Sequence, residues 1–345
     1  MKHTAVKRIV IPLCVIFLGR CSLDPDKKLN DAVRQYRSNK PGALQALEYE
    51  FINNVSAQSV ETPGLQTNGN ALYALKGNNI EILDPVKLTL SMLDGGGVKR
   101  AYLSDDYCAI ADETQLSIFR ANGDHLIDNP IGDTKHPIRS IIISGDNVIY
   151  YKDQKLYTYN IVLKTSQQFI KDVFPPPYAP YYSVNLLKSG NLLGVNAGTA
   201  GSYNFSIINL ANESVIVKNM SLSSSKIHMD GTRAYYITGN AGNWELIQYA
   251  LDQMKKKSIA RFSDIVDIEL TSAGYVYESR DGLGASEYGK DKTIIPFTYR
   301  LSGRYRDTVL LKYRDIYYIA DLKKMFAGLK RLKDQAPELF KMPNN

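Results

Sequence analysis

The chain has 345 residues, of which 22% are charged, and its formal net charge is +7 at pH 7. Four basic residues lie within the first 20 positions, which contain no acid, so the remainder carries an excess of only +3 (7 − 4). This small excess argues against an electrostatic nucleic-acid binder, which would gather basic residues on one face. Twenty-four tyrosines against one tryptophan indicate a β-rich body, because aromatic side chains fit half-buried pleated surfaces.

Residues 1–20 have the organisation of a secretory signal peptide. A basic segment, residues 2–8, precedes eleven uncharged residues from Ile9 to Gly19. A basic start followed by an apolar core of ~7–15 residues is typical of such peptides, whereas a membrane span needs ~20 apolar residues. We therefore expect residues 1–20 to direct export.

The end of this segment resembles a bacterial lipobox. Leu18-Gly19-Arg20-Cys21 has an apolar residue at −3, although Arg20 stands where Gly or Ala is usual. In this relaxed lipobox, and in its Lys-, Ile- and Tyr-rich composition, the chain is similar to spirochaete lipoproteins. The resemblance implies a Cys21 acylated with palmitate-type chains and anchored in membrane lipid of the cell envelope. Ser22, in place of a retaining aspartate, favours the outer membrane. The alternative is that Cys21 is an incidental thiol beside a signal anchor.

Removal of the signal would leave Cys108 as the one other cysteine, so no internal disulfide is expected. Cys108 lies in a strand-like run, YCAIA, where a small buried hydrophobic residue is expected rather than a nucleophile.

Residues 21–58 are expected to hold the lipid anchor and a short helical hairpin. Leu29, Val33 and Tyr36 recur at helical spacing, and a second helix is expected after Pro41-Gly42. The hairpin weakly resembles a single tetratricopeptide unit. A packing element between the anchor and the main domain is the simpler interpretation.

From residue 65 to 321 the sequence repeats. Apolar runs that follow turn residues recur at spacings of 36 to 45 residues: NALYAL (70–75), YCAIA (107–111), NVIYY (147–151), NLLGV (191–195), RAYYI (233–237), GYVYE (274–278) and IYYIA (316–320). A period near ~40–45 residues with several strands per unit is typical of a β-propeller, while a β-sandwich would not require so even a repeat. The pattern contains no motif of a particular propeller family.

The fold class is therefore all-β, a β-propeller of six or seven four-stranded blades, with seven favoured. The first unit lacks a clear innermost strand, and the last shows an innermost pair, residues 308–314 and 316–320, without outer strands. We expect the two chain ends to share one blade, because this leaves no open sheet edge.

Residues 322–345 are expected to form a C-terminal amphipathic helix and a tail. An apolar stripe that includes Leu322, Met325 and Leu329 faces away from a Lys/Arg-rich side. The helix is expected to pack on the N-terminal hairpin or the propeller. Lying on anionic lipid is the alternative.

Residues with catalytic or metal-binding chemistry are sparse. The histidines at positions 3, 125, 136 and 228 are scattered, and no metal-ligand spacing, nucleophile elbow or phosphate-binding loop is present. We therefore expect neither a metal nor a cofactor. His136 precedes a proline at the entry to a unit and is expected to be solvent-exposed rather than functional.

Two segments are longer than a blade needs. Residues 173–182 (VFPPPYAPYY) are expected to form a stiff platform for a partner or a carbohydrate, and the candidate contact residues are Pro175, Pro176, Pro177, Tyr178, Tyr181 and Tyr182. A rigid crossover between blades is the alternative. Residues 279–292 are rich in glycine and charge and are expected to form a mobile surface loop.

Two functions follow from these features. The first is a non-enzymatic envelope lipoprotein whose propeller is a scaffold for a protein partner. The second is an envelope enzyme or glycan-binding protein that acts at the central opening. The lack of clustered histidines and carboxylates favours the first, whereas a His–carboxylate pair in a pocket would favour the second.

Overall fold

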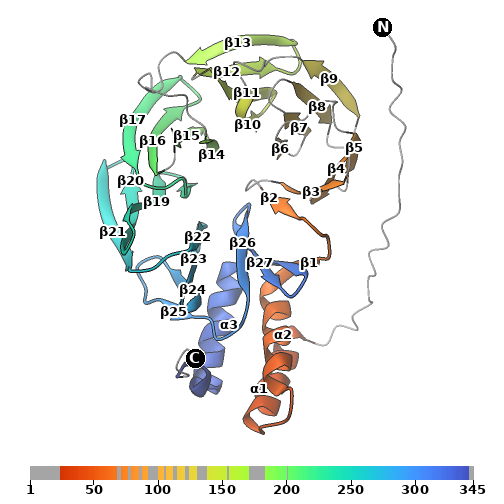
Figure 1. The fold of residues 1–345 in the computed structure, drawn as a ribbon. Coiled ribbons are helices and arrows are strands. Elements are labelled where there is room, and N and C mark those ends of the chain that lie inside the picture. Colours follow the sequence, from red (N-terminus) through yellow and green to blue (C-terminus); the bar gives the residue numbers. More distant parts are fainter. Residues whose placement is uncertain are drawn as a thin grey trace.

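The computed structural model describes residues 24–67, 71–76, 79–84, 88–91, 100–104, 106–111, 115–120, 124–129, 138–153, 155–170, 183–199 and 201–341. Over these residues the chain forms seven four-stranded antiparallel sheets around a ring, with three α-helices beside it (Figure 1). The prediction of a propeller, with seven blades rather than six, is confirmed.

Six blades follow one another along the chain, and each begins with its innermost strand. Blades 1 to 3 consist of β2 (Gln66–Thr67), β3 (Leu72–Lys76), β4 (Asn79–Asp84) and β5 (Leu88–Ser91); β6 (Arg100–Leu103), β7 (Tyr107–Ala111), β8 (Leu116–Arg120) and β9 (His125–Asn129); and β10 (Ile138–Ser144), β11 (Asn147–Lys152), β12 (Lys155–Asn160) and β13 (Thr165–Ile170). Blades 4 to 6 consist of β14 (Ser183–Ser189), β15 (Leu192–Thr199), β16 (Ser202–Asn209) and β17 (Ser214–Leu222); β18 (Ile227–Asp230), β19 (Arg233–Asn240), β20 (Asn243–Ala250) and β21 (Lys255–Phe262); and β22 (Asp267–Leu270), β23 (Gly274–Ser279), β24 (Gly282–Glu287) and β25 (Thr293–Ile294).

The seventh blade is built from both parts of the chain, as expected. Its strands are β26 (Arg300–Tyr305), β27 (Thr308–Tyr313), β28 (Ile316–Ala320) and, outermost, β1 (Ser56–Val60). β1 runs antiparallel to β28, with Ser59 opposite Tyr318 and Val60 opposite Tyr317. The closing strand thus comes from before residue 65, where the propeller was expected to begin.

The innermost strand of this blade differs from the prediction. It is β26, whereas residues 308–314 form the second strand. β26 reads RLSGRY, with arginines at both Arg300 and Arg304 and a register shift between Leu301 and Gly303. A charged, bulged strand has no apolar alternation, and for this reason it was not recognised.

The repeat in the sequence reflects the second strand of each blade. In β11 the residues Val148 to Tyr151 are all buried, because this strand is covered on both faces by neighbouring blades. Two-residue turns lead into three such strands, and Gly145, Gly190 and Gly231 occupy the first turn position at φ +59°, +57° and +55°. Glycine adopts this left-handed conformation without a Cβ penalty, which explains the recurring turn glycine.

Residues 279–292 do not form the expected surface loop but contain β24 and its two turns. Gly284 packs against Tyr277 on the neighbouring strand, and a Cβ at Gly284 would lie 2.3 Å from the tyrosine ring. The Tyr277 ring therefore requires a glycine at this position of the strand. The glycine-rich composition of residues 279–292 gives the segment the appearance of a loop.

The helices form one module outside the ring, next to the closing blade (Figure 1). α1 (Pro25–Arg37) and α2 (Ala43–Val55) make the expected hairpin, and α3 (Leu322–Gln335) is followed by the 3₁₀ turn η1 (Pro337–Phe340). Asp24 caps α1 by accepting a hydrogen bond from the Asp26 N–H, and Asp321 caps α3 in the same way. Among the described residues, no helix combines the length and the apolar character that a membrane span requires.

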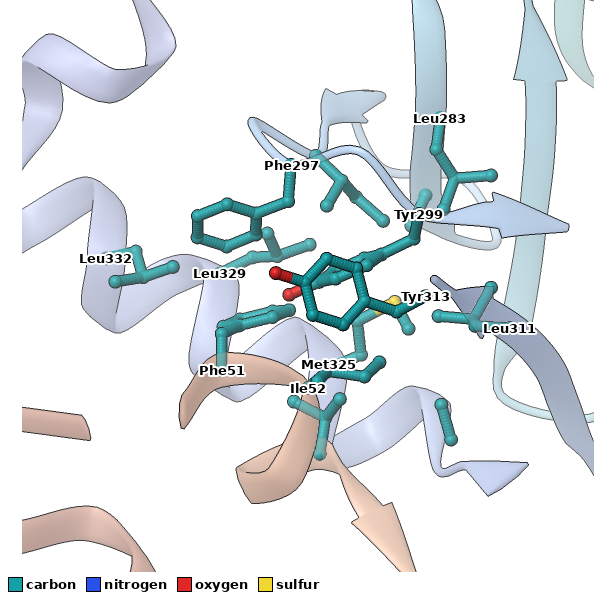
Figure 2. Close-up of a cluster of buried hydrophobic side chains, with 14 of the residues drawn as sticks. Phe51, Ile52, Leu283, Phe297, Tyr299, Leu311, Tyr313, Met325, Leu329 and Leu332 are labelled. Carbon is teal, nitrogen blue, oxygen red and sulfur yellow. The ribbon is translucent and has the colours of Figure 1, made fainter. Parts of the chain in front are cut away.

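A shared core joins this helical module to blades 6 and 7 (Figure 2). Phe51 of α2 is fully buried, with its ring centroid 5.2 Å from that of Phe297 and 6.4 Å from that of Tyr299. The Glu48 carboxylate accepts hydrogen bonds from the backbone N–H and the hydroxyl of Thr298, at 2.6 and 2.7 Å. The helices are thus held by both apolar and polar contacts.

α3 packs on the N-terminal hairpin, as the first of the two expected arrangements predicted. Gly328 lies against Phe51, where a Cβ would approach the ring to 3.0 Å. Arg331 forms an ion pair with Asp26 of α1 at 2.6 Å. The apolar stripe of α3 is therefore occupied within the molecule.

Replacing Phe51 by alanine should destabilise the protein by about 3–5 kcal/mol, because it leaves a cavity where the module meets the ring. Urea unfolding monitored by circular dichroism measures this loss. Tyr49→Ala is the matched control on the same helix, since this side chain is 44% exposed and its removal should cost little. Equal losses in the two variants would contradict the proposed packing.

Candidate functional site

The centre of the ring contains a cavity of about 820 Å³, bounded by the innermost strands. On β10 and β14 the exposed lining residues are Asn185 and Lys188, whereas Ile141, Ile142, Val184 and Leu186 are buried between blades. The wall formed by blades 5 to 7 is charged. Among the described residues of the lining, four cations (Lys188, Lys226, Arg304 and Arg306) balance four acids (Asp230, Asp267, Glu269 and Asp307). We call this space the central channel.

Lys226, just before β18, joins blades 5 and 6. Its Nζ lies 2.9 Å from Asp267 and 2.5 Å from Glu269, both on β22. Burial alone would lower the pKa of Lys226, but the carboxylates of Glu269 and Asp267 outweigh it, and the net shift of its pKa is upward. The lysine is therefore cationic, and the two carboxylates are neutralised within the wall.

Arg304 of β26 extends from blade 7 past blade 6 to His228 on β18. Its Nη1 lies 2.5 Å from His228 Nδ1 and 3.3 Å from the carbonyl oxygen of Leu270. A guanidinium can only donate, so Nδ1 accepts, and the proton of the neutral imidazole is on Nε2. Burial, reinforced by the charge of Arg304, lowers the pKa of His228 to about 3, so the ring is neutral at pH 7.

The other ring nitrogen of His228 faces Asp307, in the turn after β26. Nε2 lies 4.0 Å from Asp307 Oδ1, which is too long for a hydrogen bond. Nε2 is buried and makes no hydrogen bond. Asp307 itself accepts from the backbone N–H of Ser272 at 2.6 Å and from the Ser272 hydroxyl.

This arrangement favours binding over base catalysis. A general base needs a free lone pair and a pKa near the working pH, whereas Nδ1 of His228 is occupied by Arg304. His228 and Asp307 instead present a donor and an acceptor to the same space. No cluster of ligands suited to a metal ion occurs in the part of the chain that the structure describes.

The residues selected from the sequence lie elsewhere. Cys21, His136 and the whole Pro/Tyr segment, residues 173–182, are outside the described residues. Cys108 is buried in β7, and burial raises the pKa of its thiol to about 12, which confirms a packing role. His125 lies on β9 with its ring 5.0 Å from that of Phe119.

Of the channel residues, sequence analysis singled out only His228, as one of four scattered histidines. The other charged residues lie on the inner strands β14, β18, β22 and β26 or beside them, and the repeat pattern follows the second strands instead. A charged residue at alternate positions of an innermost strand, as in KIHMD (226–230) and DIEL (267–270), is the signal that could have located them.

No family model and no curated protein matches this chain. Several solved structures are similar in fold at low identity. The extracellular domain of a protein assigned to the one component systems of B. thetaiotaomicron is 14% identical, with a TM-score of 0.46, over 77% of this chain and 39% of that chain. Hsv2p of Kluyveromyces lactis is 12% identical, with a TM-score of 0.48, over 72% of this chain and 88% of that chain. BamB of Moraxella catarrhalis is 6% identical, with a TM-score of 0.47, over 78% and 97%.

The buried His228 should make stability depend on pH. Its pKa in the folded protein is about 3, below the usual 6.5, so the unfolded chain takes up the proton first as the pH falls. The contribution of His228 to the free energy of unfolding is therefore complete above pH 6.5. It is lost as the pH falls towards 3, at up to ~1.4 kcal/mol per pH unit. His228→Gln should therefore flatten the decline in unfolding free energy between pH 6 and pH 4, measured by urea titration at each pH. Parallel curves for both proteins would contradict this assignment.

Proposed function

We propose that this chain is a membrane-anchored, non-enzymatic lipoprotein of the cell envelope whose propeller is a binding platform for a protein partner. The anchor is an acylated Cys21, which follows a basic and then apolar leader. Two or more acyl chains hold a protein stably on a membrane, whereas one chain does so marginally.

The observation that supports this proposal most directly is the position of α1 close to Cys21 in the sequence. α1 starts four residues after Cys21, and its first turn is fixed to α3 by the ion pair between Asp26 and Arg331. The helical module lies outside the ring (Figure 1). A lipid tether at Cys21 would therefore enter at the rim of the closing blade and leave both openings of the ring free for a partner.

The Pro/Tyr segment is the proposed contact region for that partner. Residues 173–182 belong to the connection between β13, the outermost strand of blade 3, and β14, the innermost strand of blade 4. Tyrosine offers a large contact area at low entropic cost, and prolines reduce the freedom lost on binding. A connection between blades can present such residues without disturbing a sheet.

A second candidate function, ligand binding at the central opening, is favoured by the channel. The expectation that charged residues do not gather there is not met, since His228 and Asp307 lie together in a cavity. The engaged Nδ1 of His228 disfavours the enzymatic form of this alternative.

Cys21→Ala tests the anchor. In cells supplied with a labelled palmitate analogue, the wild-type protein should carry the label and sediment with membranes, and the variant should lose both properties. Cys108→Ala is the matched control, because this buried thiol is unsuited to acylation and its replacement should leave label and fractionation unchanged. A variant at position 21 that keeps the label and stays in the membrane fraction would refute the anchor.

Substitution of Tyr178, Tyr181 and Tyr182 by serine tests the platform. In crosslinked envelope preparations, wild-type protein should yield a discrete adduct that the triple variant loses, since aromatic contacts dominate such interfaces. Tyr49→Ser, which alters an exposed tyrosine on α2, should retain the adduct. An adduct of equal yield in all three proteins would exclude this segment as the contact.

A further inference from the structure

Two polar groups in the channel face each other across a gap that neither can close. His228 is 8% exposed, and its Nε2 carries a proton without an acceptor. Asp307 Oδ1 lies 4.0 Å away. Nε2 is closed to solvent, so a shift of the half-exposed Asp307 turn must first uncover it; an oxygen at ~2.8 Å from both atoms would then accept from Nε2–H and donate to the carboxylate. Of the common ligand groups, a hydroxyl does both.

The charges around this gap favour a neutral ligand. Among the described residues of the lining, four cations and four acids cancel, and the carboxylate of Asp307 would repel an anion placed at Nε2. A cation is equally disfavoured by Arg304, whose guanidinium has no carboxylate within ion-pair distance among the described residues. The spare N–H groups of Arg304 are donors for further neutral oxygens.

The remainder of the cavity suits a molecule with both polar and apolar faces. Its volume of about 820 Å³ lies within the ~300–1,000 Å³ typical of small-molecule sites. Opposite the charged wall, the half-buried Tyr102 and Leu187 provide apolar surface. A saccharide presents hydroxyls at the ring edge and C–H groups on the ring face, and it matches both walls.

We infer that the central channel binds a neutral saccharide, with His228 and Asp307 holding one hydroxyl between them and Arg304 donating to a neighbouring oxygen. This inference rests on the second candidate function, ligand binding at the central opening. It does not depend on the anchor at Cys21 or on the protein partner. Its failure would therefore leave the anchor and the platform untouched.

The experiment titrates the full chain with neutral mono- and disaccharides of glucose, galactose, mannose and N-acetylglucosamine, using calorimetry and the ¹⁵N resonances of the His228 ring. Hexanoate and hexylamine are the charged controls. At least one saccharide should bind with a dissociation constant below ~10 mM and shift the Nε2 resonance, while neither charged probe does so.

Two variants locate the site. His228→Phe removes the donor and Asp307→Ala removes the acceptor, and each should weaken saccharide binding by about tenfold or more. Asp307 is 52% exposed in a turn, so this variant should fold even if His228→Phe does not. Asp252→Ala removes an exposed acid in the turn between β20 and β21, outside the lining, and should bind as the wild type does.

Three results would overturn the inference. They are binding of none of the neutral saccharides, preferential binding of hexanoate or hexylamine, and saccharide binding that is equal in wild type and Asp307→Ala. The last two would place the ligand outside the His228–Asp307 gap, and the first would mean that water alone fills it.

Discussion

The structure depends on the pairing of β1 with β28. The ring closes with seven equal blades only if the last blade is complete, and the final three strands of this chain supply only part of it. The missing outer strand comes from Ser56–Val60, at the other end of the described chain. The seventh blade therefore needs strands from both ends of the described chain, and the six blades between them are enclosed in one ring.

This constraint also explains the position of the helices. α2 ends at Val55 and β1 begins at Ser56, so the hairpin has no linker along which it could move away from the ring. α3 follows β28 as directly, after the single residue Asp321, whose N–H donates to the carbonyl oxygen of Val55. The two chain ends therefore meet twice, once as paired strands and once as packed helices around Phe51. Any tether at the start of the chain is mechanically continuous with the closing blade.

A feature of this fold is predictable from the sequence where its physical cause leaves a local pattern of residues. Second strands such as Val148–Tyr151 are covered on both faces, which requires an apolar run, and turn glycines such as Gly145 require a left-handed backbone, so the repeat was visible. Inner strands face the channel, where β26 carries Arg304 and has no apolar alternation. Gly284 lies in a strand because Tyr277 occupies the space of a side chain, and this contact between neighbouring strands leaves no local trace. The channel was missed because its residues come from three blades and meet only in space.

The polar wall of the channel has a structural role, but that role does not account for all of it. Lys226 with its two carboxylates, and Arg304 with His228, join blades 5 to 7 through satisfied contacts. The ion pairs of Lys226 explain why its charge is buried there, since a buried ion is tolerated when it is paired, whereas Arg304 is held by hydrogen bonds to neutral groups. The Nε2–H of His228 contributes nothing to this linkage, and leaving a buried donor unsatisfied costs about 1–3 kcal/mol. Asp307 is near enough that a modest shift of its turn would satisfy it, yet Ser272 holds the carboxylate in place from the other side. A buried donor left unpaired beside a carboxylate is the arrangement expected where a ligand atom completes the network.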